Sequence, residues 1–252
     1  MSKQIFKNKI VSIIGSSGEI EENDYSEIIS KSDFVVRINT RILDNKLYLP
    51  PQVVKNTTNR MDVCCHSGQM LGEKISAGHK TYITNTECCC FTEKNFNIYY
   101  QNNIKIFMFP SHRFNRIKHD FSHYEKDLDI KLIKMEKEKS YDGSCLTTGI
   151  NCINEICMSD PKQIYIFGFD CYKGKKVNYT NYVEIGVPKG QDIKLYETKQ
   201  NQNYGSHNHN KELKFLYGIC VKNNIIIQKH LLNIFKQNNF DVSKLNVYKS
   251  NS

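Results

Sequence analysis

Three short stretches of this sequence carry residue types that can hold an anion and move a proton. The stretch Gly15-Ser16-Ser17-Gly18 allows close backbone approach and adds hydroxyl donors, and Thr147-Thr148-Gly149 places hydroxyls ahead of an expected helix. His207 lies five residues before Glu212, at the start of another expected helix. A histidine so placed can serve as a general base. Together the three stretches indicate an enzyme that binds a nucleotide-linked donor.

Each stretch also has an ordinary structural interpretation. The first lacks the glycine fingerprint of dinucleotide-binding folds and the lysine of the P-loop, so a tight turn after a strand explains it equally well. Threonine is also a common helix cap. His207 and His209 belong to a polar run that is typical of a loop. The residues alone leave both interpretations open.

An expected alternation of strands and helices positions these stretches. Apolar, β-branched runs predict strands over 9–14, 34–38, 62–65, 81–84, 104–109, 163–168 and 225–227. Helical spacing predicts helices ending near 30, over the charged region 113–139, over 150–158 and 208–222, and from 229 onward. The alternation predicts an α/β fold with a central parallel sheet flanked by helices. Ligands bind beyond the carboxyl ends of such strands, where Gly15, Asn39 and Gly168 fall.

The segment from Asp170 to Ser206 differs from the rest of the chain. It is rich in Tyr, Lys, Asn, Gln and Gly and shows no sustained period. A loop of this length is either an active-site lid or a disordered insert. We expect residues 1–252 to form a single catalytic domain with a lid over about 170–206.

Composition narrows the function classes. The chain has 252 residues, of which 39% are hydrophobic, and its net charge of +9 suits nucleic acid, an acidic surface or an anionic substrate. No run of five like charges marks a nucleic-acid tail. No apolar run approaches the roughly 20 residues of a membrane span, and no signal peptide is recognised at the start. We expect a cytoplasmic protein.

Ten cysteines are interpreted as thiols, because the sequence shows no export signal and no Cys-x-x-Cys pair. Neighbouring cysteines diverge along a strand or helix and cannot share one tetrahedral ion, so no metal site is expected. The acid-x-acid pattern Asp127-Leu128-Asp129 lies within a charged helical stretch. We expect it to be a solvated face.

The same stretches carry a family resemblance. Ile13 to Gly18, followed by Ser32 to Asn39, resembles the large sialyl motif of eukaryotic sialyltransferases, and Thr147-Thr148-Gly149 running to Phe169 resembles their small motif. Asn181 to Glu184 is similar to the third motif, with Asn181 where that family has His, and His207 to Glu212 matches the fourth. A bacterial sialyltransferase family is also similar, at 168–172 and 204–207.

The resemblance implies an inverting, metal-independent transfer of sialic acid, or a related CMP-activated sugar, from CMP-sialic acid to a glycan hydroxyl, as in protein glycosylation. It implies a Rossmann-like fold of the glycosyltransferase-A variant, no cofactor, and His207 as the base. The CMP-sugar is expected to contact Gly15, Ser16, Ser17, Gly18, Asn39, His66, Thr147, Thr148, Gly149, Gly168, Phe169, Asp170, Tyr172 and Tyr179.

The sequence departs from the eukaryotic family in three respects. Val11 stands near the position of the cysteine that ties the large and small motifs in that family, the membrane anchor is not found, and the third motif is altered. Two rival functions therefore stay open. One is a module that binds a nucleotide or a sialoside without turnover, and the other is a basic protein that binds nucleic acid.

Overall fold

The protein is described from a computed structural model, which covers residues 2–17, 20, 23–43, 45–68, 91–136, 146–171 and 208–249. The helices are α1 (Ser2–Ile5), α2 (Ser26–Ser30), α3 (Pro51–Thr57), α4 (Glu93–Gln101), α5 (Ser111–Asp127), α6 (Thr148–Cys157), α9 (His209–Lys222), α10 (Lys229–Gln237) and the 3₁₀ helix η3 (Val242–Lys244). The strands are β1 (Ile10–Ile14), β2 (Phe34–Ile38), β3 (Arg41–Leu43), β4 (Lys46–Tyr48), β5 (Val63–Cys65), β6 (Ile106–Pro110), β7 (Lys131–Met135), β8 (Gln163–Phe167), β9 (Ile226–Ile227) and β10 (Asn246–Val247).

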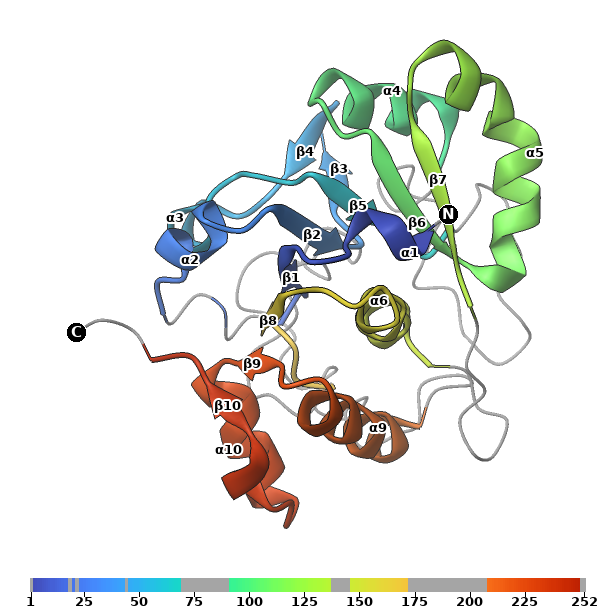
Figure 1. The fold of residues 1–252 in the computed structure, drawn as a ribbon. Helices are drawn as coiled ribbons and strands as arrows, with labels where there is room; N and C mark the ends of the chain where they lie inside the picture. Colours follow the sequence, from blue (N-terminus) through green and yellow to red (C-terminus); the bar gives the residue numbers. More distant parts are fainter. Residues whose placement is uncertain are drawn as a thin grey trace, which may run out of the picture.

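Eight of these strands form one parallel sheet in the order β10-β9-β8-β1-β2-β5-β6-β7, while β3 and β4 pair separately as an antiparallel ribbon. Strands β2, β5, β6 and β7 extend the sheet to one side of β1, and β8, β9 and β10 extend it to the other (Figure 1). Val11 lies between Phe34 of β2 and Ile164 of β8. The strand order thus reverses between β1 and β8, and such a reversal is where open α/β sheets bind ligands.

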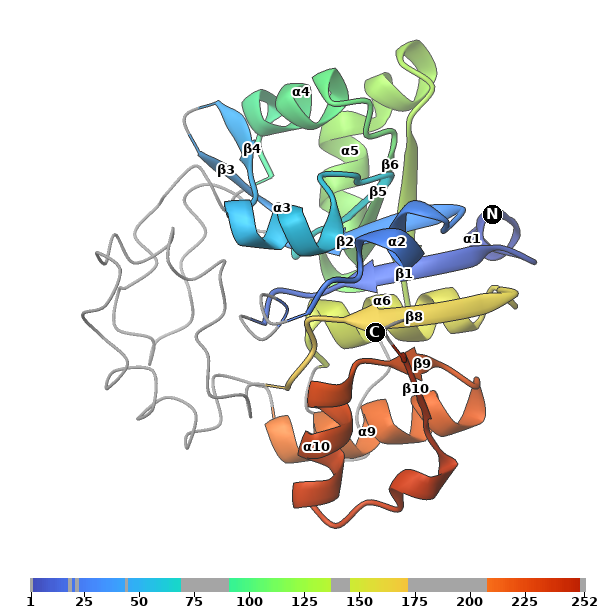
Figure 2. The same cartoon turned by 90° about the vertical axis from the view of Figure 1, so that its left-hand side faces the viewer.

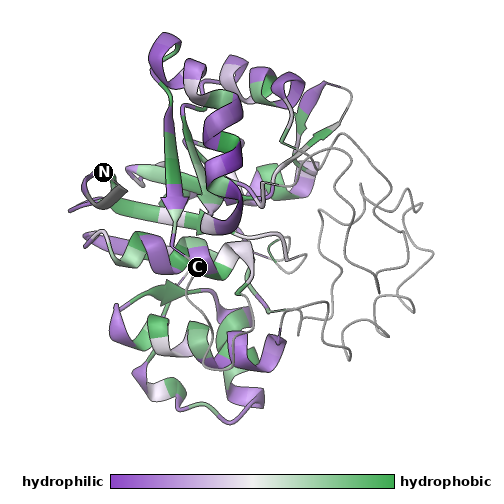
Figure 3. Cartoon of the chain, turned by 90° about the vertical axis from the view of Figure 1, so that its right-hand side faces the viewer, coloured by the Kyte–Doolittle hydropathy of each residue, from purple (hydrophilic) through white to green (hydrophobic). Residues whose placement is uncertain are grey.

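Helices cover both faces of the sheet, because successive strand residues point to opposite sides. Val36 and Ile38 pack in one apolar cluster with α6, α9 and α10. On the other face, Val35 packs with α2 and α3, and Phe107 packs with α4 and α5. Apolar strands lie between helices that are hydrophilic on their outer sides (Figures 2 and 3). The predicted central parallel sheet flanked by helices is confirmed.

The charged region 113–139 is not one helix, so that prediction is wrong. Helix α5 ends at Asp127, and β7 follows a turn in which Asp129 has a left-handed φ of +51°. In β7 the exposed Lys131 and Lys134 alternate imperfectly with buried residues. Lysines are typical of an edge strand. In β7 they obscure the alternation of apolar and polar residues that would otherwise indicate a strand. Asp127 and Asp129 are exposed at the end of α5, so the acid-x-acid pattern is solvent-facing.

Several short elements have no counterpart among the sequence-based predictions. The chain begins with α1 rather than directly with a strand, and β3, β4, α3 and β10 are also new. These elements have two to seven residues, which is too short to show a hydrophobic period. The strand predicted over 81–84 lies outside the described residues.

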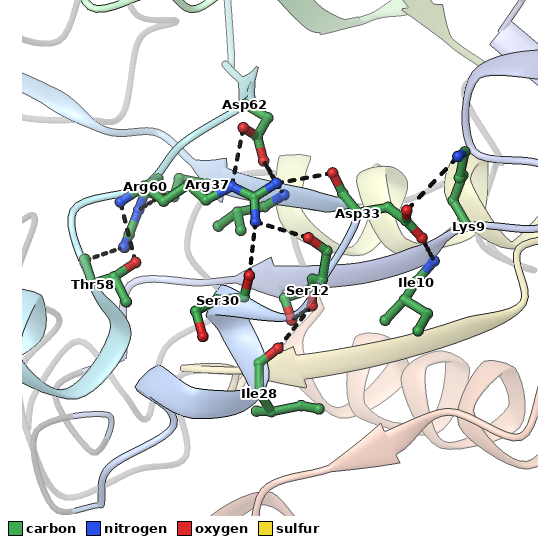
Figure 4. Close-up of polar contacts among 12 residues, drawn as sticks. Lys9, Ile10, Ser12, Ile28, Ser30, Asp33, Arg37, Thr58, Arg60 and Asp62 are labelled. Carbon is green, nitrogen blue, oxygen red and sulfur yellow. Dashed lines mark hydrogen bonds and ion pairs between the residues drawn. The ribbon is translucent and has the colours of Figure 1, made fainter.

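Two aspartates fix the amino ends of the central strands (Figure 4). The Asp33 carboxylate accepts the N–H of Ile10 at 2.7 Å, and the Asp62 carboxylate accepts the N–H of Val35 at 2.8 Å. The bond from Ile10 holds the pKa of Asp33 below its usual value. Since each aspartate precedes one strand and binds its neighbour, the pair sets the register of β1, β2 and β5.

At the amino ends of the same strands, two arginines donate hydrogen bonds to the carboxyl ends of α2 and α3. Arg60 donates to the carbonyls of Ser30, Ser32 and Asp33 at 2.8–3.2 Å, just past the end of α2. The fully buried Arg37 donates to the carbonyls of Thr57 and Thr58, where α3 ends. A cation at a helix carboxyl end is favourable for the helix dipole and satisfies its last carbonyls.

The Arg60→Ala variant is therefore expected to lose about 1–3 kcal/mol of unfolding free energy, because three backbone carbonyls and Asp62 lose a charged donor. Urea denaturation measures this loss. The control is Lys31→Ala, which removes a solvent-exposed ion pair with Glu27 and is expected to change stability by less than about 0.5 kcal/mol. Equal effects of the two substitutions would contradict the role given to Arg60.

Candidate active site

The centre of the candidate site is a contact between two turns, where β1 and β8 end. The Gly15 N–H donates to the carbonyl of Phe167 at 2.8 Å, and the Ser17 N–H donates to the carbonyl of Gly168 at 3.0 Å. A Cβ atom placed on Gly15 would lie 2.3 Å from the Gly168 oxygen, and Gly168 itself has a left-handed φ of +69°. Only glycine at position 15 permits this approach.

Ser17 and Asp170 extend this contact. The buried Ser17 hydroxyl donates to the Asp170 carboxylate at 2.9 Å, across 153 residues of sequence. Ser16, between the two backbone contacts, is partly exposed. The stretch that was expected to hold an anion is thus placed at the switch point of the sheet. Gly18, its last residue, lies outside the described residues.

The turns after β2 and β5 form the next part of the same edge. Asn39 follows β2 in a left-handed conformation with φ of +50°, and its side-chain oxygen accepts the N–H of Ser67 at 2.9 Å. His66 follows β5 and is buried, and its Nδ1 accepts the N–H of Gly68 at 2.9 Å. Its ring packs against Phe91 at a centroid distance of 5.5 Å. Asn39 is partly exposed, whereas His66 lies beneath the surface of this edge.

The amino end of α6 lies beside these turns. Thr147 is its N-cap residue, yet the Thr147 side chain makes no capping hydrogen bond. A Cβ atom on Gly149 would lie 2.8 Å from the ring of Phe169 and 3.8 Å from Ile38. Thr148 and Gly149 therefore lie next to the ends of β2 and β8, and the N–H groups of this first turn can bind an anion.

Glu212 connects this helix start to α9. Its buried carboxylate accepts the N–H of Thr147, and its second oxygen lies 3.4 Å from Nδ1 of the buried His209. Asn208 caps α9 by accepting the N–H of Lys211 at 3.1 Å, which confirms the predicted helix start. Of the two histidines in the polar run, His209 is therefore part of the packed interior of the protein.

The structure brings together Gly15, Ser16, Ser17, Asn39, His66, Thr147, Thr148, Gly149, Gly168, Phe169 and Asp170 at the carboxyl edge of the sheet. The other predicted site residues are Gly18, Tyr172, Tyr179 and the expected base His207, all of which lie outside the described residues, as does the part of the predicted lid beyond Cys171. Their roles stay predictions.

One residue of this edge was missed by sequence reasoning. Gln228 follows β9, is fully buried, and accepts the N–H of Gly168 at 2.8 Å, so it fixes the turn that touches Gly15. A usable signal existed, because Gln228 directly follows the apolar run 225–227. The rule that polar residues after parallel strands lie near the ligand applies to it as it does to Asn39.

The described cysteines are thiols, as expected, and most are deeply buried. Burial raises the pKa of Cys64 and of Cys157 to about 12, and it also raises the pKa of Cys65 and Cys220. Within the described ranges, no group of three or more His, Cys, Asp or Glu side chains is arranged to hold a metal ion. None of the helices described is long and apolar enough to cross a membrane.

These thiols make stability fall in alkali. In the unfolded chain they ionise near their usual pKa of 9.0, whereas in the folded chain they stay protonated, so the unfolded state binds fewer protons above pH 9. The free energy of unfolding is expected to fall as pH rises from 9 to 11, by less than about 1.4 kcal/mol per pH unit for each thiol, which is the limit for one full proton. Urea titrations at several pH values test this. Cys64→Ala should flatten the slope by one thiol's share, and an unchanged slope would contradict the assignment.

Comparison with known proteins gives matches among solved structures. No protein-family model matches the chain, and no curated protein matches it. The chain is similar to a mammalian sialyltransferase in complex with Gal-beta-1-3GalNAc-ortho-nitrophenol, with 13% identity and a TM-score of 0.46 over 87% of this chain and 68% of that chain. It is similar to a variant of the sialyltransferase CST-II in complex with CMP, with 16% identity and a TM-score of 0.49 over 92% of this chain and 85% of that chain.

A third similar structure is the sialyltransferase CstII from Campylobacter jejuni in complex with the substrate analogue CMP-3FNeuAc. The identity is 17% and the TM-score is 0.45, over 96% of this chain and 89% of that chain. At these values the likeness assigns neither a substrate nor a residue role to this chain.

Proposed function

We propose that the protein is a glycosyltransferase of the sialyltransferase type, which transfers sialic acid or a related sugar from a CMP-linked donor to a glycan hydroxyl. One observation carries the proposal. Gly15 of the large-motif stretch touches Gly168, and Gly149 of the small-motif stretch touches the adjoining Phe169. Stretches that resemble two separate sialyl motifs therefore meet at one point, and that point is the switch point of a parallel sheet.

The chemistry follows from the groups at this edge. The N–H groups and hydroxyls at the start of α6 suit the donor carboxylate or phosphate, and Asn39 with the Gly15 turn suits the cytidine nucleotide. CMP leaves as a phosphate monoester, whose charge hydroxyl and amide donors can stabilise without a metal ion. We assign Tyr172 and Tyr179 to this role, and the lid over about 170–206 to the exclusion of water.

In the proposed reaction, His207 takes the proton of the acceptor hydroxyl. The acceptor oxygen forms a bond to the anomeric carbon while the bond from that carbon to the CMP phosphate breaks on the opposite side. The electron pair of the broken bond leaves with CMP. A single displacement of this kind inverts the configuration at the anomeric carbon. We further propose that this occurs in the cytoplasm, which the thiol state of the described cysteines supports.

The proposal is tested by incubating the purified protein with CMP-sialic acid and a lactose-type acceptor, with and without EDTA, and measuring CMP and sialylated product. Product formation that persists in EDTA is the expected result. Binding of CMP without turnover would instead indicate a nucleotide-binding or sialoside-binding module. Salt-sensitive binding of RNA or DNA without binding of CMP-sialic acid would indicate the nucleic-acid-binding alternative.

A further inference from the structure

A buried side chain of α9 binds the start of α6. Glu212 lies in the first turn of α9, is 2% exposed, and accepts the N–H of Thr147 at the start of α6. Its backbone N–H donates to Asn208 at 2.9 Å, and the next residue, Leu213, is buried in the apolar cluster that also holds Ile150 of α6. The backbone of Glu212 is therefore fixed in α9, while its carboxylate binds the start of α6.

This bond lies at a helix start whose own N-cap side chain makes no capping hydrogen bond. The Thr147 side chain does not cap α6, whereas in α4 and α9 the N-cap side chains of Thr92 and Asn208 accept a backbone N–H of their own first turn. Because Glu212 binds the N-cap residue itself, it holds the start of the helix and with it the N–H groups of the following turn. Those are the groups that the proposed function assigns to the donor.

We propose that Glu212 is a positioning residue. It sets the location of the donor-binding turn at the start of α6 relative to the start of α9, and α9 begins two residues after His207 in the sequence. The inference rests on the proposed function. The positioning role depends on the length of the Glu212 side chain and not on its charge. An oxygen at the end of a five-atom side chain is sufficient to accept the Thr147 N–H, so a glutamine serves, whereas an aspartate is one methylene too short.

The experiment compares Glu212→Gln, Glu212→Asp and Glu212→Ala with wild type in three measurements: Kd for CMP by calorimetry, kcat and KM for the donor, and Tm. Glu212→Gln is expected to keep Kd and kcat/KM within about threefold of wild type. Glu212→Asp and Glu212→Ala are expected to bind CMP more weakly and to lose roughly 10- to 100-fold in kcat/KM, since a displacement near 1 Å costs this much in an aligned site.

A matched control lies in α6 itself. Glu155 is also buried, at 4% exposure, and its carboxylate also accepts a backbone N–H, that of Glu136 at 3.2 Å. It lies about two turns beyond the helix start. Glu155→Ala is expected to lower Tm, as Glu212→Ala does, yet to leave Kd for CMP unchanged. A loss of CMP affinity in both alanine variants would show a general effect of stability and would overturn the proposal.

The remaining outcomes separate the inference from the proposed function. If wild type binds CMP and Glu212→Gln is as impaired as Glu212→Ala, the charge matters and the positioning role is wrong. If Glu212→Asp behaves as wild type, the reach does not matter and the role is equally wrong. If wild type does not bind CMP, the proposed function itself fails, and the inference fails with it.

Discussion

Replacement of His207 by alanine is expected to lower the kcat of transfer roughly 100- to 10,000-fold, the usual contribution of a general base. The Kd for CMP should stay within a few-fold of wild type, because the groups assigned to the nucleotide lie after β1 and β2 and at the start of α6. Rapid-quench measurement of product, combined with calorimetry for CMP, separates the two effects. Added imidazole should restore part of the lost rate if the missing group is a base.

His119 provides the matched control. Its side chain is 88% exposed on α5, so His119→Ala should leave kcat, Kd and Tm unchanged. Activity of His207→Ala close to that of wild type would remove His207 from the mechanism. The structure offers no replacement in His209, because that side chain is buried against Glu212.

The second large effect is expected from Gly15→Ala. The added methyl group would lie 2.3 Å from a backbone oxygen, that of Gly168, and 3.1 Å from the Phe169 ring, so the two turns must separate. Overpacking of this kind typically costs about 1–3 kcal/mol, and the rigid backbone partner here places the cost at or above the upper end. Urea denaturation should show this loss, and CMP binding should fall with it because the separated turns are the proposed nucleotide site.

Gly218 supplies the comparison for this substitution. It lies inside α9, and a Cβ atom there meets nothing within 4 Å beyond its chain neighbours and the backbone of its own helix. Gly218→Ala should leave CMP binding intact and stabilise the protein by about 0.5–1 kcal/mol, because alanine loses less conformational freedom in a helix. If Gly15→Ala were as well tolerated as Gly218→Ala, the close approach of the two turns would not exist in solution.

Sequence reasoning succeeded where one strong local pattern decides the structure. The apolar runs of β1, β2, β6 and β8 are bounded by polar or turn residues, and their alternation with helices predicts a parallel sheet. The same logic located Gly15, Asn39 and Gly168, because residues that follow parallel strands share one edge. These predictions needed no side-chain detail.

The misses have physical causes as well. Strand β7 carries lysines on an edge, so its charges imitated a continuing helix. The partner of Glu212 could not be predicted, because a carboxylate that binds a backbone N–H 65 residues away leaves no trace in local sequence. Arg37 and Asp33 lie within the motif-like stretch that ends at Asn39, yet they bind helix and strand ends at the opposite edge. Asp33 and Arg37 therefore stabilise the fold and are not part of the candidate site.

The position of β8 beside β1 also has a consequence for synthesis of the protein. Ile10 of β1 pairs with Gln163 of β8. During synthesis, one edge of β1 therefore stays unpaired until a further 153 residues have been added. At ordinary translation speeds this interval lasts roughly 10–30 s. Throughout it, the nascent chain presents an unpaired apolar strand edge, which is the usual template for aggregation. We therefore expect ribosome-bound fragments that end before β8 to depend on chaperones, and the proposed nucleotide site to form only after β8 has emerged.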